Sequence, residues 1–163
     1  MRTARSAVPA LVLLALLVVG AGPAQAQQQA APAPRITLDE AKTAMDAAEA
    51  AARANGWNLA FVITDADGVP IYLRRMEGVP TRNYEVAMNK VNTVITAQMH
   101  TVDYAAAVEA GEIEAIEGAL TYEGGLLLRR DGQVLGAFSA SGARGSEDAE
   151  AVLAGMAAIG ISP

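Results

Sequence analysis

The chain has 163 residues, and its 18 aspartates and glutamates outnumber its 12 lysines and arginines, which gives a formal net charge of −6. So acidic a composition argues against nucleic acids and anionic membranes as partners, because both bind to basic patches. There is no cysteine and only one histidine. Disulfide bonds are therefore excluded, and an ordinary zinc site lacks the three or four histidine, cysteine or carboxylate ligands that zinc needs.

The first 26 residues have the three parts of a secretory signal peptide. Arg2 and Arg5 supply positive charge, Val8–Gly20 is apolar, and Ala24-Gln25-Ala26 is a small-x-small cleavage pattern. The apolar run is shorter than the roughly 20 residues that a bilayer span needs. We therefore expect cleavage after residue 26, a periplasmic or secreted protein, and no membrane span after the signal is removed.

Residues 27–35 are mostly polar or proline-containing and have no periodicity, as is typical of a flexible N-terminal tether. Residues 36–163 are expected to form a single domain. Its first helix is expected over residues 38–54. Thr37 and Glu40 form a capping-box pattern before it, and Asn55-Gly56 is a typical helix stop after it.

Two hairpins are predicted by apolar runs that flank short turns. Residues 57–64 are apolar on both faces, and residues 69–75 return after the turn Asp65-Ala66-Asp67-Gly68. In the second hairpin, residues 126–130 and 133–139 flank Asp131-Gly132, a dipeptide that suits tight turns with positive φ angles. A short strand at residues 119–122 would complete a five-stranded sheet.

Three further helices are expected. A long one lies between the hairpins, a second covers residues 102–109, and the last covers residues 147–159 after Gly145-Ser146. Strands clustered in hairpins and covered by helices indicate an α+β domain with about five antiparallel strands. The long helix is predicted by apolar residues at helical spacing, namely Tyr84, Ala87, Met88, Val91, Val94, Ile95 and Met99.

The single histidine follows this apolar stripe, in the stretch Gln98-Met99-His100-Thr101. If the long helix continues this far, His100 lies opposite the stripe, whereas Met99 belongs to the stripe and to the core. One alternative is an exposed histidine at a helix C-terminus, where positive charge is favourable. The other is a metal ligand. A serine–histidine–acid triad would have to use this histidine, and the serines of "FSASG" lack the usual nucleophile elbow.

Several motifs follow one another over about residues 36–159. They are "ITLDEAKTAMDAAEAAARANGW", "VITDADGVPIYLRRMEGVP", the lysine and threonine of "NKVNT", "YEGGLLLRRDGQVLGAFSASG" and the helix after "SED". In order and spacing they resemble the GlcG/HbpS-type haem-binding family, which includes the C-terminal domain of PduO-type proteins. The resemblance implies a sheet flanked by helices of the profilin or sensor-domain kind, and assembly into homo-oligomers. It also implies haem binding in some members.

The resemblance assigns roles to particular residues. Arg75 and Lys90 match family positions, and Thr101 matches a threonine that lies near the iron in haem-binding relatives. Where the family often reads arginine-arginine-proline-threonine, this chain has Gln98-Met99-His100-Thr101. A cationic helix end has thus lost its charge and gained two potential iron ligands. The implied site is a pocket near residues 99–101, with His100 as the candidate ligand of a haem iron.

Two loops are further candidates. The paired glycines of Glu123-Gly124-Gly125 allow close approach of a ligand to the backbone, but they equally suit the entry to a strand. The loop at residues 141–146 precedes the last helix, whose N-terminus could hold an anion. Alternatively, Ser146 is simply the N-cap of that helix. Arg75 and Lys90 could receive an acidic small molecule, or pair with neighbouring acids.

Three functions stay open at this point. The first is an exported GlcG-like protein that binds a small planar or anionic ligand, such as haem, near Met99, His100 and Thr101. The second is an enzyme acting on a small carboxylated or aromatic metabolite, using Lys90, Arg75 and the turn at residues 123–125. The third is a structural or interaction module with a vacant pocket. The sequence does not decide whether any reaction is catalysed.

Overall fold

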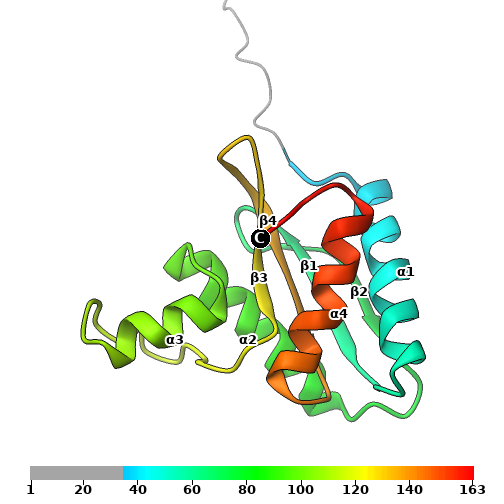
Figure 1. The fold of residues 1–163 in the computed structure, drawn as a ribbon, viewed down its shortest axis with the longest axis horizontal. Helices are drawn as coiled ribbons and strands as arrows, with labels where there is room; N and C mark the ends of the chain where they lie inside the picture. Colours follow the sequence, from blue (N-terminus) through cyan, green and yellow to red (C-terminus); the bar gives the residue numbers. More distant parts are fainter. Residues whose placement is uncertain (1–34) are drawn as a thin grey trace, which may run out of the picture. The chain divides into compact units, whose positions relative to one another are not determined.

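A computed structural model of the protein describes residues 35–163. The predicted signal peptide, and the predicted tether up to residue 34, lie outside the described residues. Four helices and four strands follow one another along the described chain, in the order helix, hairpin, two helices, hairpin, helix (Figure 1). They are α1 (Leu38–Ala54), β1 (Ala60–Asp65), β2 (Pro70–Arg75), α2 (Thr81–Ala97), α3 (Thr101–Glu109), β3 (Gly125–Arg130), β4 (Gln133–Ser141) and α4 (Gly145–Ala158).

Helix α1 begins with the capping box that the sequence predicts. The backbone N–H of Glu40 donates to Thr37 Oγ1 at 3.2 Å, and the N–H of Thr37 donates to the Glu40 carboxylate at 2.9 Å. These bonds satisfy amides that have no partner inside a helix. The predicted helix bounds are confirmed.

The four strands form one antiparallel sheet in the order β2-β1-β4-β3. Both predicted hairpins are present, and they join through the pairing of β1 with β4. In the second hairpin Asp131 takes the left-handed conformation, with φ 51°. This agrees with the positive φ that a tight Asp-Gly turn requires. The predicted α+β class is therefore confirmed, with four strands in place of about five.

The fifth strand predicted at residues 119–122 is wrong, because this segment is irregular. Its backbone N–H groups form hydrogen bonds outside the sheet. The N–H of Leu120 donates to Thr93 Oγ1 of α2 at 2.8 Å, and the N–H of Ala119 donates to the carbonyl of Ile116 at 3.1 Å. The segment is thus held by α2 and by its own turn.

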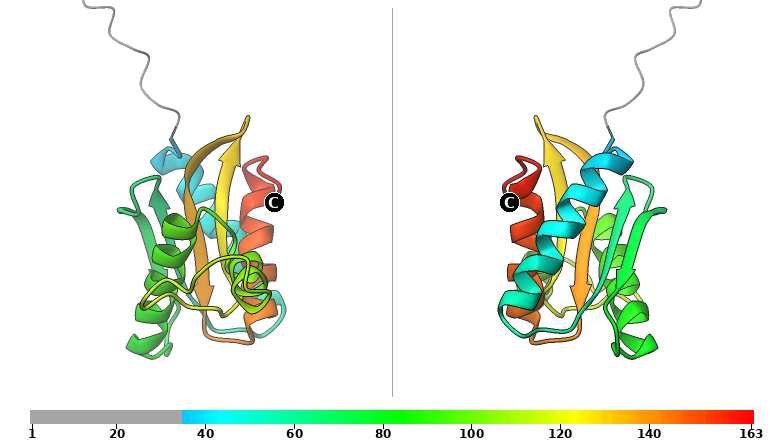
Figure 2. Two further views of the ribbon diagram at one scale, coloured as in Figure 1. Left: turned by 90° about the vertical axis from the view of Figure 1, so that its left-hand side faces the viewer. Right: turned by 90° about the vertical axis from the view of Figure 1, so that its right-hand side faces the viewer.

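Helices α1 and α4 pack side by side on one face of the sheet, and α2 covers the other face (Figures 1 and 2). The contact between α1 and α4 depends on small residues, including buried Ala44 and Ala151. Gly155 of α4 lies so close to α1 that an added Cβ would be 2.5 Å from the Ala44 carbonyl oxygen. In residues 35–163, no helix combines the length and hydropathy needed to cross a membrane.

Helix α2 ends earlier than its apolar stripe suggests. Gln98 takes the left-handed conformation with φ 56°, and α3 starts after it with His100 as N-cap. His100 is therefore not at a helix C-terminus, and its position relative to the stripe cannot be counted along α2. Met99 is only partly buried, so its predicted place in the core is wrong. The break turns residues 99–101 toward β3.

Candidate ligand-binding site

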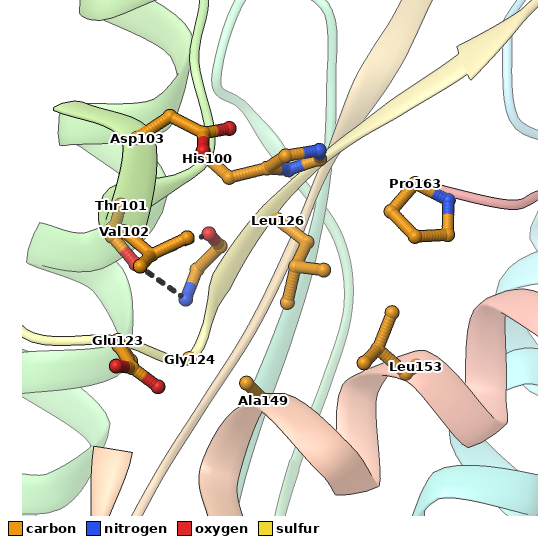
Figure 3. Close-up of a pocket in the computed structure, with 11 residues that line it drawn as sticks. His100, Thr101, Val102, Asp103, Glu123, Gly124, Leu126, Ala149, Leu153 and Pro163 are labelled. Carbon is orange, nitrogen blue, oxygen red and sulfur yellow. Dashed lines mark hydrogen bonds between the residues drawn. The ribbon is translucent and has the colours of Figure 1, made fainter. Parts of the chain in front are cut away.

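A pocket of about 300 Å³ lies between the start of α3, the start of β3 and one side of α4. Figure 3 shows Asp103 and Glu123 on the α3 side of this pocket, and Ala149 and Leu153 on the α4 side. Both acids of the lining thus lie on one side of the pocket, and the α4 side is apolar. The lining residues are His100, Thr101, Val102, Asp103, Glu123, Gly124, Gly125, Leu126, Ala149, Leu153 and Pro163.

The imidazole of His100 is half-buried beside Leu126 (Figure 3). Its Nδ1 accepts a hydrogen bond from the backbone N–H of Leu127 at 2.9 Å. Burial lowers the pKa of His100 below its ordinary value. Nearby Asp103 opposes this shift, and Arg129 adds to it. The side chain is therefore neutral at pH 7. Because Nδ1 is the acceptor, the single ring proton lies on Nε2.

The hydroxyl of Thr101 is bound to the first residue of β3. Oγ1 donates to the carbonyl of Gly125 and accepts from the Gly125 N–H, both at 3.2 Å. Thr101 is 1% exposed. Together, Thr101 and His100 satisfy backbone groups of Gly125 and Leu127 that face away from β4. The start of α3 thus covers the free edge of β3, which would otherwise present unpaired amides.

The two glycines before and within β3 are required by close packing. A Cβ on Gly124 would lie 2.6 Å from Asp148 Cβ and 2.7 Å from Lys90 Nζ, and φ at Gly124 is 105°. A Cβ on Gly125 would lie 2.8 Å from Thr101 Cγ2. These contacts give a structural reason for the glycine pair, which also forms part of the pocket wall. Glu123 lies at the pocket margin and is partly exposed.

Lys90 lies beside the pocket rather than in its lining. It is 2% exposed, and its Nζ donates to Asp148 Oδ2 and to the carbonyl of Ala140, both at 2.8 Å. Burial lowers the pKa of Lys90 and raises the pKa of Asp148, and the attraction between the two charges opposes both shifts. Since Lys90 comes from α2 and Asp148 from α4, the pair joins the two helical layers at the end of the sheet.

Asp148 was not identified from the sequence. A signal for it does exist, because Lys90 falls between Ala87, Val91 and Val94 on the apolar stripe of α2. A lysine in such a position needs a buried acid as its partner. The sequence gives no means of choosing that acid among 18 candidates.

Arg75 and Met99 lie apart from this pocket. Arg75 is on β2 at the opposite edge of the sheet, where it donates to the Val79 carbonyl and to Thr81 Oγ1, both at 3.2 Å. It lines a separate cavity of about 200 Å³. Met99 lines a hollow of about 160 Å³ that adjoins His100 and also includes Arg129. Arg75, Lys90 and the turn at residues 123–125 therefore do not converge on one site.

The N-terminus of α4 is occupied by its own chain. Arg144 is the N-cap, so the prediction of Ser146 in that position is wrong. The N–H of Arg144 donates to the Glu147 carboxylate at 3.0 Å, and the N–H of Ala143 donates to Asp148 Oδ1 at 3.1 Å. These internal carboxylates take the place that a bound anion would occupy.

The charged side chains that line the pocket are both acids, Asp103 and Glu123. Neither forms a salt bridge with another of the described residues. Within the same part of the chain, no three histidines or acids are arranged to hold a metal ion. The pocket can therefore offer an apolar surface, two carboxylates and one imidazole N–H.

Comparison with known proteins places this geometry in a family. Three similar solved structures are a PduOC–haem complex, HbpS, and a double mutant of HbpS from Streptomyces reticuli. They show 23%, 26% and 24% sequence identity, with TM-scores of 0.71, 0.72 and 0.73. The matches cover 78%, 81% and 93% of this chain, and 97%, 95% and 99% of the respective structures.

No curated protein matches the chain in sequence. A family model described as haem degrading protein HbpS-like matches residues 36–157, which is most of the chain. This match confirms the resemblance inferred from the sequence motifs, and the chain belongs to the HbpS-like family.

Proposed function

We propose that the protein binds a small, flat, mainly apolar molecule in the pocket between α3, β3 and α4. The observation that carries this proposal is an apolar surface of Leu126, Ala149 and Leu153 that faces a half-buried, neutral His100. Ligand pockets commonly combine such a surface with a few placed polar groups, and about 300 Å³ is the lower end of their usual range. A single aromatic ring system suits this size.

Haem is the ligand that the family description and the PduOC complex suggest. The apolar wall suits the face of a porphyrin, but the polar groups do not fit haem in this arrangement. His100 has its Nδ1 lone pair bound to Leu127, and its Nε2 carries the proton, so no lone pair is free for iron. Both bonds of Thr101 Oγ1 go to Gly125.

The propionates of haem are anions, and the side chains best suited to them are arginine and lysine. The charged residues of this pocket are Asp103 and Glu123 instead. The site therefore offers an apolar surface for a flat ring, but no group suited to the iron or to the propionates. We accordingly propose binding of a flat molecule without assigning His100 to iron.

Binding of 2-naphthol, measured by fluorescence titration, tests the pocket directly. Ala149→Phe fills the apolar wall, and Ala157→Phe places the same ring at an exposed position of α4 as the matched control. We expect saturable binding in the wild type and in Ala157→Phe, and its loss in Ala149→Phe. The proposal is wrong if the wild type shows no saturable binding, or if Ala149→Phe binds equally well.

A hemin titration tests the assignment of His100. We expect no histidine-ligated Soret band in the wild type, and the same spectrum in His100→Ala. A sharp Soret band in the wild type that is lost in His100→Ala would contradict this expectation. That result would show that His100 leaves Leu127 to hold iron, and it would restore haem as the ligand.

We also propose that the protein is exported, with residues 1–26 as its signal, and that it forms homo-oligomers. The first proposal is supported by the sequence pattern of the N-terminus and the second by the family resemblance. The intact mass of the protein purified from its native host tests cleavage, and a mass that includes Met1 would contradict it. Light scattering tests assembly, and a monomer at high concentration would contradict that.

A further inference from the structure

The two carboxylates of the pocket come from different elements on the α3 side, with Thr101 and Val102 between them (Figure 3). Asp103 is in the first turn of α3, and Glu123 lies two residues before β3. Figure 3 shows both on the side of the pocket opposite Ala149 and Leu153. A ligand whose flat body packs on the α4 side therefore turns its other end toward one or both carboxylates.

Two cations lie near these carboxylates but outside the pocket lining, because Lys90 attracts Glu123 and Arg129 lines the adjoining hollow together with Asp103. Lys90 is buried under Gly124 and bound to Asp148 and the Ala140 carbonyl. The guanidinium of Arg129 donates to the carbonyl of Gln98 at 3.0 Å and lies in the adjoining hollow with Met99. No lysine or arginine is among the residues that line the pocket. The lining of the pocket itself therefore carries two acids and no cation, and an incoming ligand meets these acids directly.

His100 adds no positive charge that would offset these acids at neutral pH. Its Nδ1 is held by the Leu127 N–H, so protonation would place two donors face to face and lose that hydrogen bond. The imidazole faces Asp103 on α3 and Arg129 on β3, whose effects on it oppose each other. Because the imidazole is neutral, Asp103 and Glu123 determine the charge of the pocket, which is negative.

We infer that the pocket selects a cationic ligand, a primary or secondary amine attached to a flat aromatic or compact apolar body, and disfavours carboxylates. This inference rests on the proposed function, because it names the ligand class of the same site. The charge of this ligand is opposite to that of the anionic ligand that the family resemblance suggests. Opposite charge at a partly exposed margin adds modest affinity, and salt weakens it.

Three probes with one ring system separate charge from apolar contact. They are 1-naphthylmethylamine, 1-naphthalenemethanol and 1-naphthoate, with binding measured by fluorescence or calorimetry at pH 7. We expect the amine to bind about fivefold more tightly than the alcohol, and the alcohol to bind more tightly than the carboxylate. About 0.5 M salt should reduce this preference, because the acids are solvent-accessible.

Charge-removal variants locate the source of the preference. Asp103→Asn with Glu123→Gln removes both pocket acids, and we expect the three probes to bind within about twofold of one another. Glu112→Gln with Glu114→Gln removes two exposed acids outside the pocket and changes the net charge equally. This control is expected to keep the full preference for the amine.

The outcomes distinguish the two proposals. The inference is overturned if the carboxylate binds as tightly as the amine, or if the pocket double variant keeps the amine preference. Equal binding of all three probes, lost in Ala149→Phe, overturns the inference and leaves the proposed function standing. Absence of binding by every probe overturns both.

Discussion

The two faces of the sheet are built on different principles. On the face covered by α1 and α4, alanines and Gly155 allow the helices to approach closely, and the interior is almost wholly apolar. On the α2 side, several buried polar groups are held by specific bonds. Ser139 Oγ donates to the Ala87 carbonyl at 2.7 Å, and Lys90 is bound to Asp148. Packing on the first face depends on the small size of the side chains. Packing on the second face depends on hydrogen bonds and on an ion pair between buried groups.

This difference explains where the pocket lies. Close packing of small side chains on the α1/α4 face leaves little room for a ligand. The pocket lies where α3, β3 and α4 meet, beside the Lys90–Asp148 pair and the bonds from His100 and Thr101 to β3. Loss of a polar partner should therefore damage the pocket side most, whereas added volume should damage the α1/α4 side.

The largest effect is expected from Lys90→Met, which leaves Asp148 buried without its cation. Removal of one partner from a buried ion pair costs about 3–5 kcal/mol of unfolding free energy. Lys90→Met combined with Asp148→Asn should recover at least half of the loss, because no uncompensated charge remains. Urea denaturation measures both. If the unfolding free energy of Lys90→Met alone lies within about 1 kcal/mol of the wild-type value, the ion pair does not stabilise the fold.

The next effect is expected from Gly155→Ala on the opposite face. The new Cβ would be 2.5 Å from the Ala44 carbonyl oxygen and 2.6 Å from Phe138 Cε1, so α1 and α4 must separate. Overpacking of this kind costs about 2–3 kcal/mol. Ala157→Ser on the exposed side of α4 is the matched control and should change stability by less than about 0.5 kcal/mol. Equal stability of the two variants would contradict the tight packing.

A smaller and pH-dependent effect is expected at His100. Its pKa is lower in the folded chain than the ordinary value of 6.5, so the unfolded chain binds more protons between these two values. The stabilising contribution of neutral His100 is therefore present at pH 7 and is lost as the pH falls below about 6.5 toward the lowered folded pKa.

Two variants separate the hydrogen bond of His100 from its titration. His100→Ala removes the acceptor for the Leu127 N–H and should cost about 1 kcal/mol at pH 7. His100→Asn offers an amide oxygen in place of Nδ1 and should keep most of that stability. We expect its unfolding free energy to change less than that of the wild type between pH 7 and 5. The same pH slope in both proteins would contradict the assignment.

The smallest effect is expected at Thr64 of β1. Its hydroxyl is buried, and it has no hydrogen-bond partner among residues 35–163. Thr64→Val should therefore stabilise the protein by up to about 1 kcal/mol. Thr93→Val is the matched control and should destabilise it, because Thr93 Oγ1 accepts from Leu120 and donates to the Asn89 carbonyl. A destabilising Thr64→Val in thermal denaturation would contradict this reasoning.

Local signals in the sequence predict most of the fold. The Thr37–Glu40 capping box and the Asp131-Gly132 turn act within a few residues, so they can be recognised without knowledge of the tertiary structure. The sequence does not mark the end of α2, because Gln98 takes a left-handed conformation with neither glycine nor proline beside it. The irregular segment at residues 119–122 was misjudged because its bonds go to α2.

The candidate site could be predicted only in part. His100, Thr101, Glu123, Gly124 and Gly125 were named from the sequence, and the structure brings them to one pocket. The apolar wall from α4 was missed, because Ala149 and Leu153 resemble ordinary helix residues until α4 is placed against β3. The separation of Arg75 follows from the strand order, which places β2 and β3 at opposite edges. Strand order is a tertiary property that no local pattern records.

The covering of β3 by His100 and Thr101 also limits how copies of the chain can associate. At Gly125 and Leu127, a neighbouring molecule can pair with β3 only after it displaces the start of α3. Among the strands at residues 60–141, β2 is the one left for such extension, and it begins at Pro70, which has no N–H to donate. Association through helical surfaces meets neither of these obstacles.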